Sequence, residues 1–332
     1  MMQSIAVSVI IPTYNRVARL RRVLEALATQ SYSSERFEVV VVSDGSTDGT
    51  EAYCRQAQTP FHLTFIQQAN AGPAAARNRG LTAARGAIVL FLDDDVVPVP
   101  DLIAAHMRLH GERSRRVVLG TMLTPPDARL SPWVAWEQAM LEKQYRAMTS
   151  GVWPATARQF YTGNTSLSRD LVTTAGGFDE RFRRAEDIEL AYRLDKLGVE
   201  FVFAPQAVGY HYAERSFASW LATPYIYGRN DIIFGREHQI DLLGFVQREF
   251  GQRNRLTRWL VWLLLDRPRA SAVALAMMPQ LAYLAHRLFG ERGSRPLYSA
   301  IFNLRYYQGV ADELGGRDRF FAPVTAVEAA QA

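Results

Sequence analysis

Four short apolar runs alternate with helix-forming segments in the first hundred residues of the chain. The runs, at residues 5–12, 37–43, 62–67 and 87–92, are continuously apolar or β-branched and do not alternate with polar residues. Such runs are typical of parallel strands that are covered on both faces. The segments between them have helical composition, with apolar residues on one side. The pattern predicts an α/β domain with a doubly wound, mostly parallel, Rossmann-like sheet.

Polar residues follow each of the four predicted strands, at residues 12–15, 44–46, 70–72 and 93–95. In a doubly wound sheet, ligands bind outside the carboxyl ends of the strands. We therefore expect the functional side chains to gather at this edge.

The composition narrows the class of protein. The chain has 332 residues, of which 48% are hydrophobic, which suffices for a sizeable core. Its one cysteine, Cys54, excludes an internal disulfide and a cysteine-rich zinc site and favours a reducing compartment, with the cytoplasm as the default.

Residues 1–16 lack the basic start and cleavage site of a signal peptide, so we expect a strand there. The net charge of +5 fits nucleotide phosphates, anionic lipid or no particular partner, and we expect no nucleic acid.

Three consecutive aspartates, Asp93, Asp94 and Asp95, end the fourth run with no basic residue beside them in the sequence. Carboxylates that are packed together raise one another's pKa, so the group is costly without a cation. Mg²⁺ and Mn²⁺ prefer oxygen ligands, and Mg²⁺ is commonly shared between one or two carboxylates and substrate phosphates. On an extended backbone, Asp93 and Asp95 face one ligand while Asp94 points elsewhere. A solvated acidic turn is the alternative.

The segment SDGSTDGT, at residues 43–50, superficially resembles a calcium loop. Arg55 stands where that loop requires a glutamate, which excludes the EF-hand. We expect Asp44 to end a strand in a glycine-permitted turn, with Ser46 or Thr47 as the N-cap of the next helix. From there its carboxylate can accept the ring N–H of a pyrimidine.

The segment GPAAARNRG, at residues 72–80, is predicted to open a helix with Pro73 near its first position. Arg77 then lies about one turn into the helix, where the helix terminus and the side chain both favour an anionic phosphate. An alanine-rich surface helix is the alternative.

Glu186 and Asp187 begin a predicted amphipathic helix. Negative charge is favoured in a first helical turn, which is the structural explanation for the pair. A carboxylate at this place can instead take a proton from an acceptor hydroxyl.

Histidines offer weaker signals. His211 is a metal ligand or a packed histidine, and His106 with His110 fit a surface or partly buried helix because H-E-x-x-H is absent. No P-loop, G-x-G-x-x-G or G-x-S-x-G motif occurs, which disfavours P-loop NTPases, dinucleotide dehydrogenases and α/β-hydrolases.

Seven motifs follow one another along residues 5–212: VSVIIPTYNR, VVVSDGSTDGT, NAGPAAARNRG, LFLDDDVVP, TGNTSLSRD with GGFDERF, AEDIELAYRL and His211. In this order and spacing they resemble the family 2 glycosyltransferases of the GT-A fold. The resemblance implies an inverting transferase that moves a sugar from a nucleotide diphosphate, usually UDP, to an acceptor hydroxyl with Mn²⁺ or Mg²⁺. Residues 252–256, QRNRL, lack the tryptophan of the processive Q-x-x-R-W motif, so we expect a non-processive bacterial type that transfers one sugar per encounter.

The resemblance also implies roles for the donor side of the site. Pro12, Tyr14 and Asp44 would line the base pocket, and Arg77 would contact the nucleotide or diphosphate. Asp93 would reach the ribose, and the metal ligands would be Asp95 and His211.

The remaining roles lie near the donor sugar and the acceptor. Gly163 and Asn164 fall on the loop beside the donor sugar, and Asp187 matches the catalytic base. Glu186 and Asp94 are counted with the substrate-binding residues, although we expect Asp94 to tolerate replacement.

The chain after the resemblance has a different composition. We expect a catalytic domain over residues 1–215 and a helical region over 216–332, of which the last dozen residues form a loose tail. Residues 244–295 contain nine arginines and three acidic residues, with Trp259 and Trp262 among them. Such helices either lie on an anionic membrane surface or form a cap with a solvated basic face. The longest uncharged run, 270–285, is too short to cross a bilayer.

The membrane interpretation suits a lipid-linked glycan as acceptor, in cell-surface polysaccharide synthesis, with the protein peripheral on the inner face of the plasma membrane. Two other classes of protein compete with a transferase. A sugar nucleotidyltransferase needs a glycine- and lysine/arginine-rich loop after the first strand, where PTYNR stands, and a non-catalytic nucleotide-sugar-binding protein has no need of Asp187.

Overall fold

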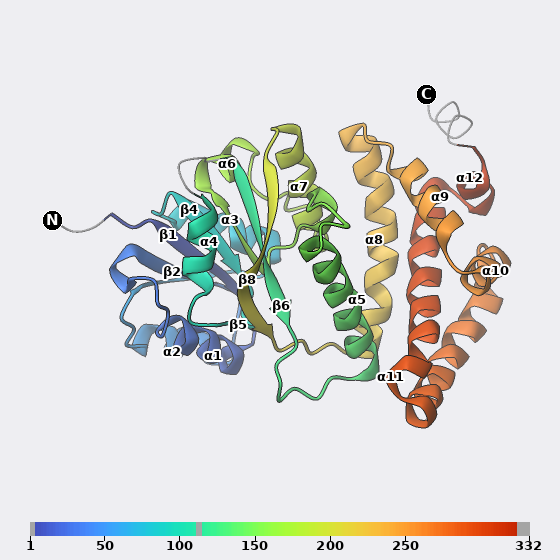
Figure 1. Ribbon diagram of the computed structural model, residues 1–332, viewed down its shortest axis with the longest axis horizontal. Coiled ribbons are helices and arrows are strands. Elements are labelled where there is room, and N and C mark those ends of the chain that lie inside the picture. The colour runs from blue at the N-terminus through green and yellow to red at the C-terminus, as the bar shows by residue number, and fades with distance from the viewer. Residues whose placement is uncertain (1–3, 111–114, 324–332) are drawn as a thin grey trace. The chain divides into compact units, whose positions relative to one another are not determined.

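The computed structural model describes residues 4–110 and 115–323 (Figure 1). One eight-stranded sheet has the strand order β3-β2-β1-β4-β7-β6-β8-β5. Its strands are β1 (Val7–Thr13), β2 (Phe37–Asp44), β3 (His62–Gln68), β4 (Ile88–Leu92), β5 (Val96–Pro98), β6 (Arg116–Leu123), β7 (Asn164–Ser168) and β8 (Glu200–His211).

The four strands predicted from apolar runs pair in parallel, β3 with β2, β2 with β1 and β1 with β4. The later strands make the sheet mixed, because β7 runs antiparallel to β4 and β6, and β5 runs antiparallel to β8. The predicted α/β, mostly parallel class is therefore confirmed.

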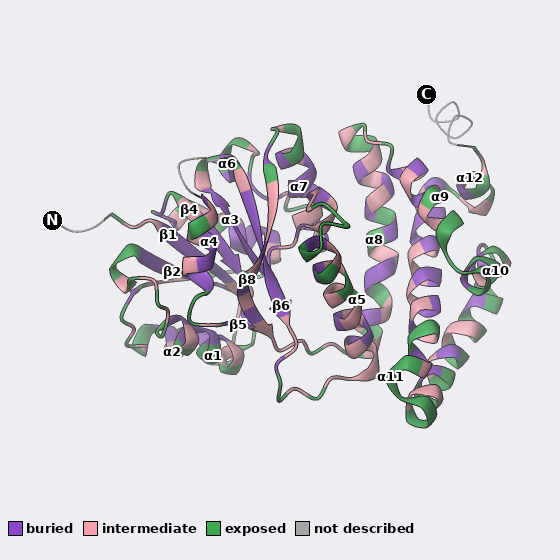
Figure 2. Cartoon of the chain, in the orientation of Figure 1, coloured by how far each residue is buried: buried purple, intermediate pink, exposed green. Residues whose placement is uncertain are grey.

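Helices cover both faces of the sheet. They include α1 (Val17–Leu27), α2 (Thr50–Gln56), α3 (Pro73–Ala83), α4 (Leu102–His110), α6 (Arg169–Thr174) and α7 (Glu186–Lys196). Within β2, Val39 and Val41 share a buried cluster with α1 and α4, whereas Val40 and Val42 pack with Ala76 of α3. Successive side chains of a strand point to opposite faces, so the continuous apolar run reflects burial on both sides (Figure 2).

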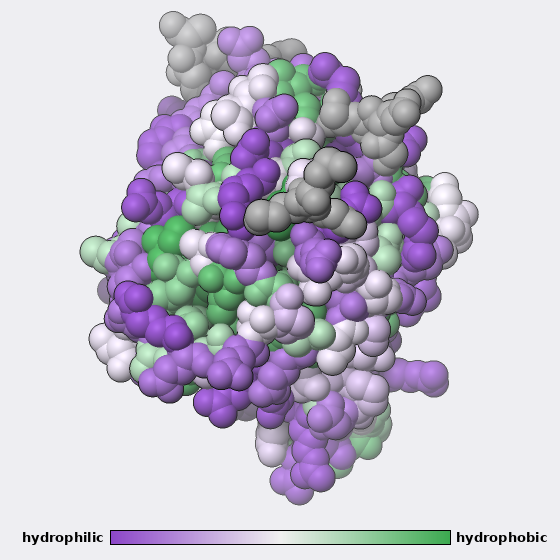
Figure 3. Space-filling model, turned by 90° about the vertical axis from the view of Figure 1, so that its left-hand side faces the viewer, coloured by the Kyte–Doolittle hydropathy of each residue, from purple (hydrophilic) through white to green (hydrophobic). Residues whose placement is uncertain are grey.

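The edge strand β3 is less buried than the central strands, since Leu63, Phe65 and Ile66 are only half-buried. Hydrophobic residues also occur on the surface of the molecule. On the face that Figure 3 shows, hydrophobic residues gather in one region that hydrophilic residues surround.

β8 runs unbroken through Pro205 and absorbs the irregularity as a bulge opposite residues 119–121 of β6. One local prediction is wrong. The helix after β2 begins at Thr50, and its N-cap is Gly49 with φ 89°, so neither Ser46 nor Thr47 caps it.

The chain divides into two compact units, residues 1–128 with 141–213 and residues 129–140 with 214–332. The first unit holds the whole sheet. Residues 129–140, which we had expected in the catalytic domain, fall in the second unit and contain the start of α5 (Pro132–Thr149).

The second unit is helical over its described residues. It contains α8 (Phe217–His238), α9 (Leu242–Gln252), α10 (Arg255–Leu264), α11 (Pro268–Leu314) and α12 (Arg317–Phe321). Gly228 of α8 and Gly309 of α11 allow close packing, because a Cβ on either would overlap a backbone carbonyl oxygen of the other helix. In the described part of the chain, no helix combines the length and apolarity needed to cross a membrane. The predicted tail falls largely outside the described residues.

Candidate active site

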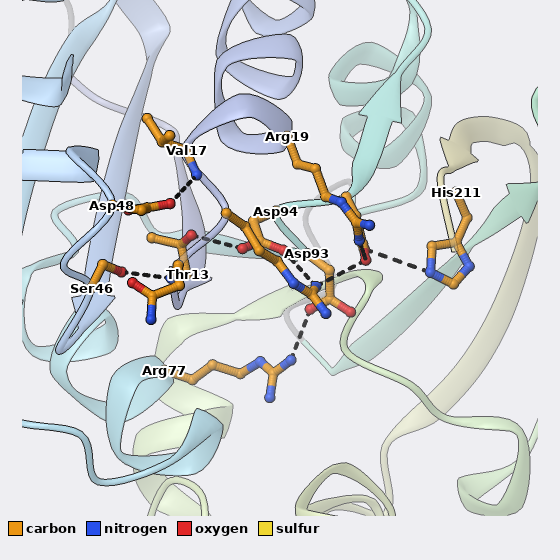
Figure 4. Close-up of polar contacts among 12 residues, drawn as sticks. Thr13, Val17, Arg19, Ser46, Asp48, Arg77, Asp93, Asp94 and His211 are labelled. Atoms are coloured by element: carbon orange, nitrogen blue, oxygen red, sulfur yellow. Dashed lines mark hydrogen bonds and ion pairs between the residues drawn. The ribbon is translucent and has the colours of Figure 1, made fainter. Parts of the chain in front are cut away.

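The loops that follow β1 and β2 are joined to each other by hydrogen bonds. Asn15, with a left-handed φ of 52°, donates its N–H to Ser46 Oγ (3.0 Å) and accepts from the Thr47 N–H (2.8 Å). The Val17 N–H at the start of α1 donates to Asp48 Oδ2 at 2.8 Å (Figure 4). Sequence patterns assigned no role to Asn15 or Asp48, because their partners lie about thirty residues away.

Three residues were predicted to line a base pocket at this edge. Tyr14 is 51% exposed, Pro12 is half-buried and Asp44 is buried. The Asp44 carboxylate accepts the N–H groups of Ala71 and Gly72 at 2.8 Å each, so it fixes the turn that leads into α3. Asp44 Oδ2 accepts only from Gly72 among the described contacts, and it can accept a further donor.

The three aspartates form a turn between β4 and β5 in place of the expected extended segment. The Val96 N–H donates to the Asp93 carbonyl at 3.1 Å, which closes the turn. We had predicted that an extended backbone makes Asp93 and Asp95 face one ligand. The turn shows that the backbone is not extended here, so this prediction is wrong.

The Asp94 side chain is buried and does not face solvent. It accepts from Thr13 Oγ1 at 2.7 Å and from Arg16 Nη1 at 3.0 Å. Burial raises the pKa of the Asp94 carboxyl to about 6, against the opposing charge of Arg16.

Basic residues do surround the aspartates, although none adjoins them in sequence. Arg16 Nη1 lies 3.0 Å from Asp95 Oδ2 as well as 3.0 Å from Asp94 Oδ1. Arg19 Nη1 lies 3.4 Å from the same oxygen of Asp95. Both arginines come from the start of α1, so the cation predicted to be missing is supplied in part by the chain itself.

Asp95 and His211 are the pair expected to hold a metal ion. Pairing of Val96 in β5 with His211 in β8 sets Asp95 and His211 side by side, and His211 Nε2 lies 3.6 Å from Asp95 Oδ1. His211 Nδ1 is buried without a partner. Over residues 4–110 and 115–323, no group of three histidine, cysteine or acidic residues is arranged to hold a metal. The pair fits as two ligands of a site whose remaining ligands come from elsewhere, as Mg²⁺ sites with substrate phosphates require.

Arg77 lies at the centre of the site, inside the first unit. Its Nη2 donates to Asp93 Oδ1 at 2.9 Å, and its Nη1 donates to Glu186 Oε1 at 2.7 Å. The guanidinium is buried, sits over the Phe178 ring at 5.7 Å, and leaves Nε without a partner. Arg77 therefore connects the aspartate turn to the first turn of α7.

Glu186 and Asp187 start α7 as predicted, after Ala185 in a left-handed conformation with φ 61°. Asp187 accepts the Ile188 N–H at 2.9 Å and is half-buried. Burial, helped by the neighbouring charge of Glu186, raises the pKa of the Asp187 carboxyl to about 7. Such a carboxyl exchanges a proton near neutral pH, which suits a general base.

Gly163 borders the site, whereas Asn164 does not reach it with its side chain. A Cβ on Gly163 would lie 3.0 Å from Asp93 Oδ2 and 2.7 Å from Met122 Sδ, so a larger residue there would have to displace these side chains. Asn164 is fully buried, and its amide donates to the carbonyls of Thr121 and Ala207. The Asn164 side chain therefore joins β6 to β8, and the place of Asn164 beside the donor sugar stays a prediction.

His106 and His110 are buried, which corrects the surface or partly buried helix predicted for them. His106 Nε2 lies 2.9 Å from Asn164 Oδ1, and Ser166 Oγ lies between the two histidine rings at 2.8 and 2.7 Å. Burial lowers the pKa of each histidine to about 4, so this polar chain is neutral at physiological pH.

Comparison with known proteins agrees with this geometry. Residues 8–174 match the family model described as "Glycosyl transferase family 2". The chain is 33% identical over 230 residues to validoxylamine A glucosyltransferase of Streptomyces hygroscopicus subsp. jinggangensis, an alignment covering 61% of this chain and 54% of that protein. The chain thus spans about half the length of this relative.

Solved structures share the fold. The mannosyltransferase PcManGT from Pyrobaculum calidifontis, in complex with GDP-Man and Mn²⁺, matches with a TM-score of 0.62 and 20% identity over 92% of this chain and 87% of that one. S. aureus TarS 1-349 in complex with UDP-GlcNAc matches with a TM-score of 0.57 and 18% identity over 93% of this chain and 90% of that one. At these identities, the likeness shows the fold alone.

Proposed function

Because the chain belongs to glycosyltransferase family 2, we propose that it is an inverting, metal-dependent enzyme that transfers one sugar from a nucleotide diphosphate sugar to an acceptor hydroxyl. The observation that carries the proposal is the pair of contacts made by Arg77. They bring Asp93, at the end of β4, and the first turn of α7, which holds Asp187, to one place.

In the proposed reaction, the Asp187 carboxylate takes the proton of the acceptor hydroxyl as that oxygen attacks the anomeric carbon of the donor. The bond from this carbon to the diphosphate breaks on the opposite side, and one displacement inverts the anomeric configuration. A pKa of about 7 for Asp187 lets the carboxylate ionise near neutral pH and still accept a proton. A retaining route needs a second carboxylate as nucleophile, whereas the other described carboxylates of the site, on Asp93, Asp94, Asp95 and Glu186, are paired with arginines.

The leaving diphosphate needs positive charge. Arg77, Arg16 and Arg19 supply it from the chain, at the same edge as the aspartate turn. We propose that Asp95 and His211 hold Mn²⁺ or Mg²⁺, which would neutralise charge on the diphosphate. The presence of Mn²⁺ with GDP-Man in the structure of the mannosyltransferase PcManGT supports the use of a divalent ion.

For the donor, we propose a UDP-sugar. Asp44 retains an oxygen that can accept the ring N–H of uracil, and Tyr14, which follows the neighbouring strand β1, is exposed. The two structural neighbours bind different nucleotides, GDP-Man and UDP-GlcNAc, so the base must be tested directly.

For the acceptor, we propose a lipid-linked glycan and peripheral attachment to an anionic membrane on its cytoplasmic face. Support comes from the arginine and tryptophan content of α10 and the first part of α11. A sugar nucleotidyltransferase is less well supported, because the loop after β1 is PTYNR and has no glycine-rich sequence.

The proposal is tested by donor turnover and by thermal shift. Wild type should hydrolyse or transfer from one nucleotide sugar, with Mn²⁺ required, and that sugar alone should raise the melting temperature in a screen of UDP-, GDP- and dTDP-sugars. Asp187→Asn should lose turnover by a factor of about 10² or more while still binding donor. Asp195→Asn, at an exposed position of the same helix, is the matched control. Equal turnover by wild type and Asp187→Asn would reject Asp187 as the base and favour a binding protein.

A further inference from the structure

The first half of α11 carries an apolar stripe on its outer side. The stripe consists of Val273 (59% exposed), Met277 (57%), Leu281 (50%), Leu284 (52%) and Leu288 (64%). Steps of four, four, three and four residues keep these side chains on one face of a helix. A different side of the helix is buried, through Ser271, Met278 and Ala282, about a third of a turn from the stripe. The stripe is therefore a second apolar face, separate from the one that packs in the core.

The stripe has defined ends and a defined length. At about 1.5 Å per residue, it runs for about 22 Å along the helix. Phe289, 72% exposed, follows it directly, and Gly290 then breaks the helix with φ 66° and ψ −162°. A soluble monomer seldom exposes so long an apolar face without a partner.

Positive charge lies along one flank of the stripe. Arg269 and Arg287 are both exposed and are eighteen residues, or five helical turns, apart, so they project in the same direction. No acidic residue occurs between Arg267 and Gly290. The neighbouring α10 adds exposed Arg255, Arg258, Leu256 and Trp259.

This charge favours one occupant over the others. A second copy of the chain would bring arginines against arginines with no carboxylate between them. An anionic lipid surface instead offers phosphates to the arginines and acyl chains to the leucines, which is how amphipathic helices lie in a bilayer interface. Tryptophan is enriched at the same depth.

We propose that the apolar stripe of α11, with its arginine flank, is the surface by which this chain binds an anionic lipid bilayer, lying in the interface without crossing it. The inference rests on the membrane attachment proposed above and specifies the residues that carry it. It does not depend on the transfer chemistry, because lipid binding is measured without donor or acceptor.

Vesicle flotation of the full chain tests the inference. Wild type should float with phosphatidylcholine vesicles that contain phosphatidylglycerol, and much less with phosphatidylcholine alone or at high salt. Leu281→Glu with Leu284→Glu should lower the partition coefficient more than about tenfold. Arg269→Ser with Arg287→Ser should lower it about fivefold per arginine, and only for anionic vesicles.

Val152→Glu is the matched control, since Val152 is an exposed apolar residue (71%) of the first unit, and it should float like wild type. Circular dichroism shows that each variant is folded. Three outcomes would overturn the inference: wild type that stays unbound at low salt, a stripe variant that floats as well as wild type, or a dimer that the stripe variant dissociates while neither binds vesicles. Donor turnover of the same preparations separates failure of this inference from failure of the proposed chemistry.

Discussion

Arg77 Nη1 lies 2.7 Å from Glu186 Oε1, although 109 residues separate the two in sequence. The same guanidinium donates to Asp93, so one buried cation holds two carboxylates from different parts of the chain. Removing one partner of a buried ion pair leaves the other charge uncompensated and costs about 3–5 kcal/mol. We expect Arg77→Met to lose about this much free energy of unfolding, measured by urea denaturation, together with donor turnover.

Arg79→Met is the control for this prediction. Arg79 is exposed on the same helix, and its replacement should change the free energy of unfolding by less than about 0.5 kcal/mol. If Arg77→Met and Arg79→Met had equal free energies of unfolding, the contacts of Arg77 would contribute nothing to stability.

The raised pKa of Asp187 predicts the pH dependence of activity. A base must be ionised, so kcat/KM should rise with pH through about 7 and reach a plateau above it. Asp195→Asn should keep this profile. An activity that is level from pH 5 to pH 8 would contradict the assignment.

The same group predicts how stability depends on pH, with the sign opposite to that of an ordinary salt-bridged carboxylate. The folded pKa, about 7, lies above the ordinary value of 3.8, so between these values the folded chain binds the proton that the unfolded chain has lost. The contribution of Asp187 to stability is therefore lost as pH rises through this window. Asp187→Asn should be more stable than wild type above pH 7, and the difference should vanish near pH 4, as measured by thermal unfolding.

The sheet could be predicted from sequence because its signal is local. Val39 to Val42 are apolar at every position, which indicates a strand buried on both faces, and the structure divides them between the two helical layers. The start of α7 could be predicted for the same reason, since Glu186 and Asp187 directly precede apolar residues at helical spacing.

The contacts of the site could not be predicted, because they depend on pairings between distant segments. Arg16 reaches Asp94 and Asp95 from 78 and 79 residues away, and nothing near the aspartates indicates it. Asn164 looks like a loop residue by composition, yet strand pairing places its amide between β6 and β8. A one-dimensional pattern gives the burial of a segment but not the partner of a polar side chain.

The burial of Asp94 reverses our expectation that it tolerates replacement. Asp94→Ala would leave the Thr13 hydroxyl without its acceptor and remove one of the two acceptors of Arg16 Nη1, at a cost of about 1–3 kcal/mol. Asp127→Ala, at an exposed position of the first unit, should be neutral. Denaturant unfolding of both variants checks this, and equal midpoints would restore the earlier expectation.

Arg16 predicts a competition at the proposed metal pair. Its Nη1 lies 3.0 Å from Asp95 Oδ2, so an ion bound to Asp95 must share that carboxylate with a like charge. We expect Arg16→Gln to bind Mn²⁺ about fivefold more tightly in the absence of donor, from the loss of roughly 1 kcal/mol of repulsion. The paramagnetic resonance signal of free Mn²⁺ measures this directly. Asp95→Asn should abolish binding and Arg21→Gln should not change it, whereas weaker binding by Arg16→Gln would show that the arginine assists the ion.

The two glycines between α8 and α11 give a prediction for the second unit. A Cβ on Gly228 would overlap the carbonyl oxygen of Tyr306, and a Cβ on Gly309 would overlap that of Tyr225. These atoms are backbone and cannot rotate away, so the helices must separate. We expect either glycine-to-alanine variant to lose about 1–3 kcal/mol of unfolding free energy.

Gly251→Ala, in α9, is the control, because a Cβ there meets nothing within 4 Å. Its unfolding free energy should instead rise by up to about 1 kcal/mol, because alanine is the better helix former. Thermal unfolding of the three variants tests these predicted changes in stability. Equal melting temperatures for all three would mean that the close approach of α8 and α11 adds nothing to stability.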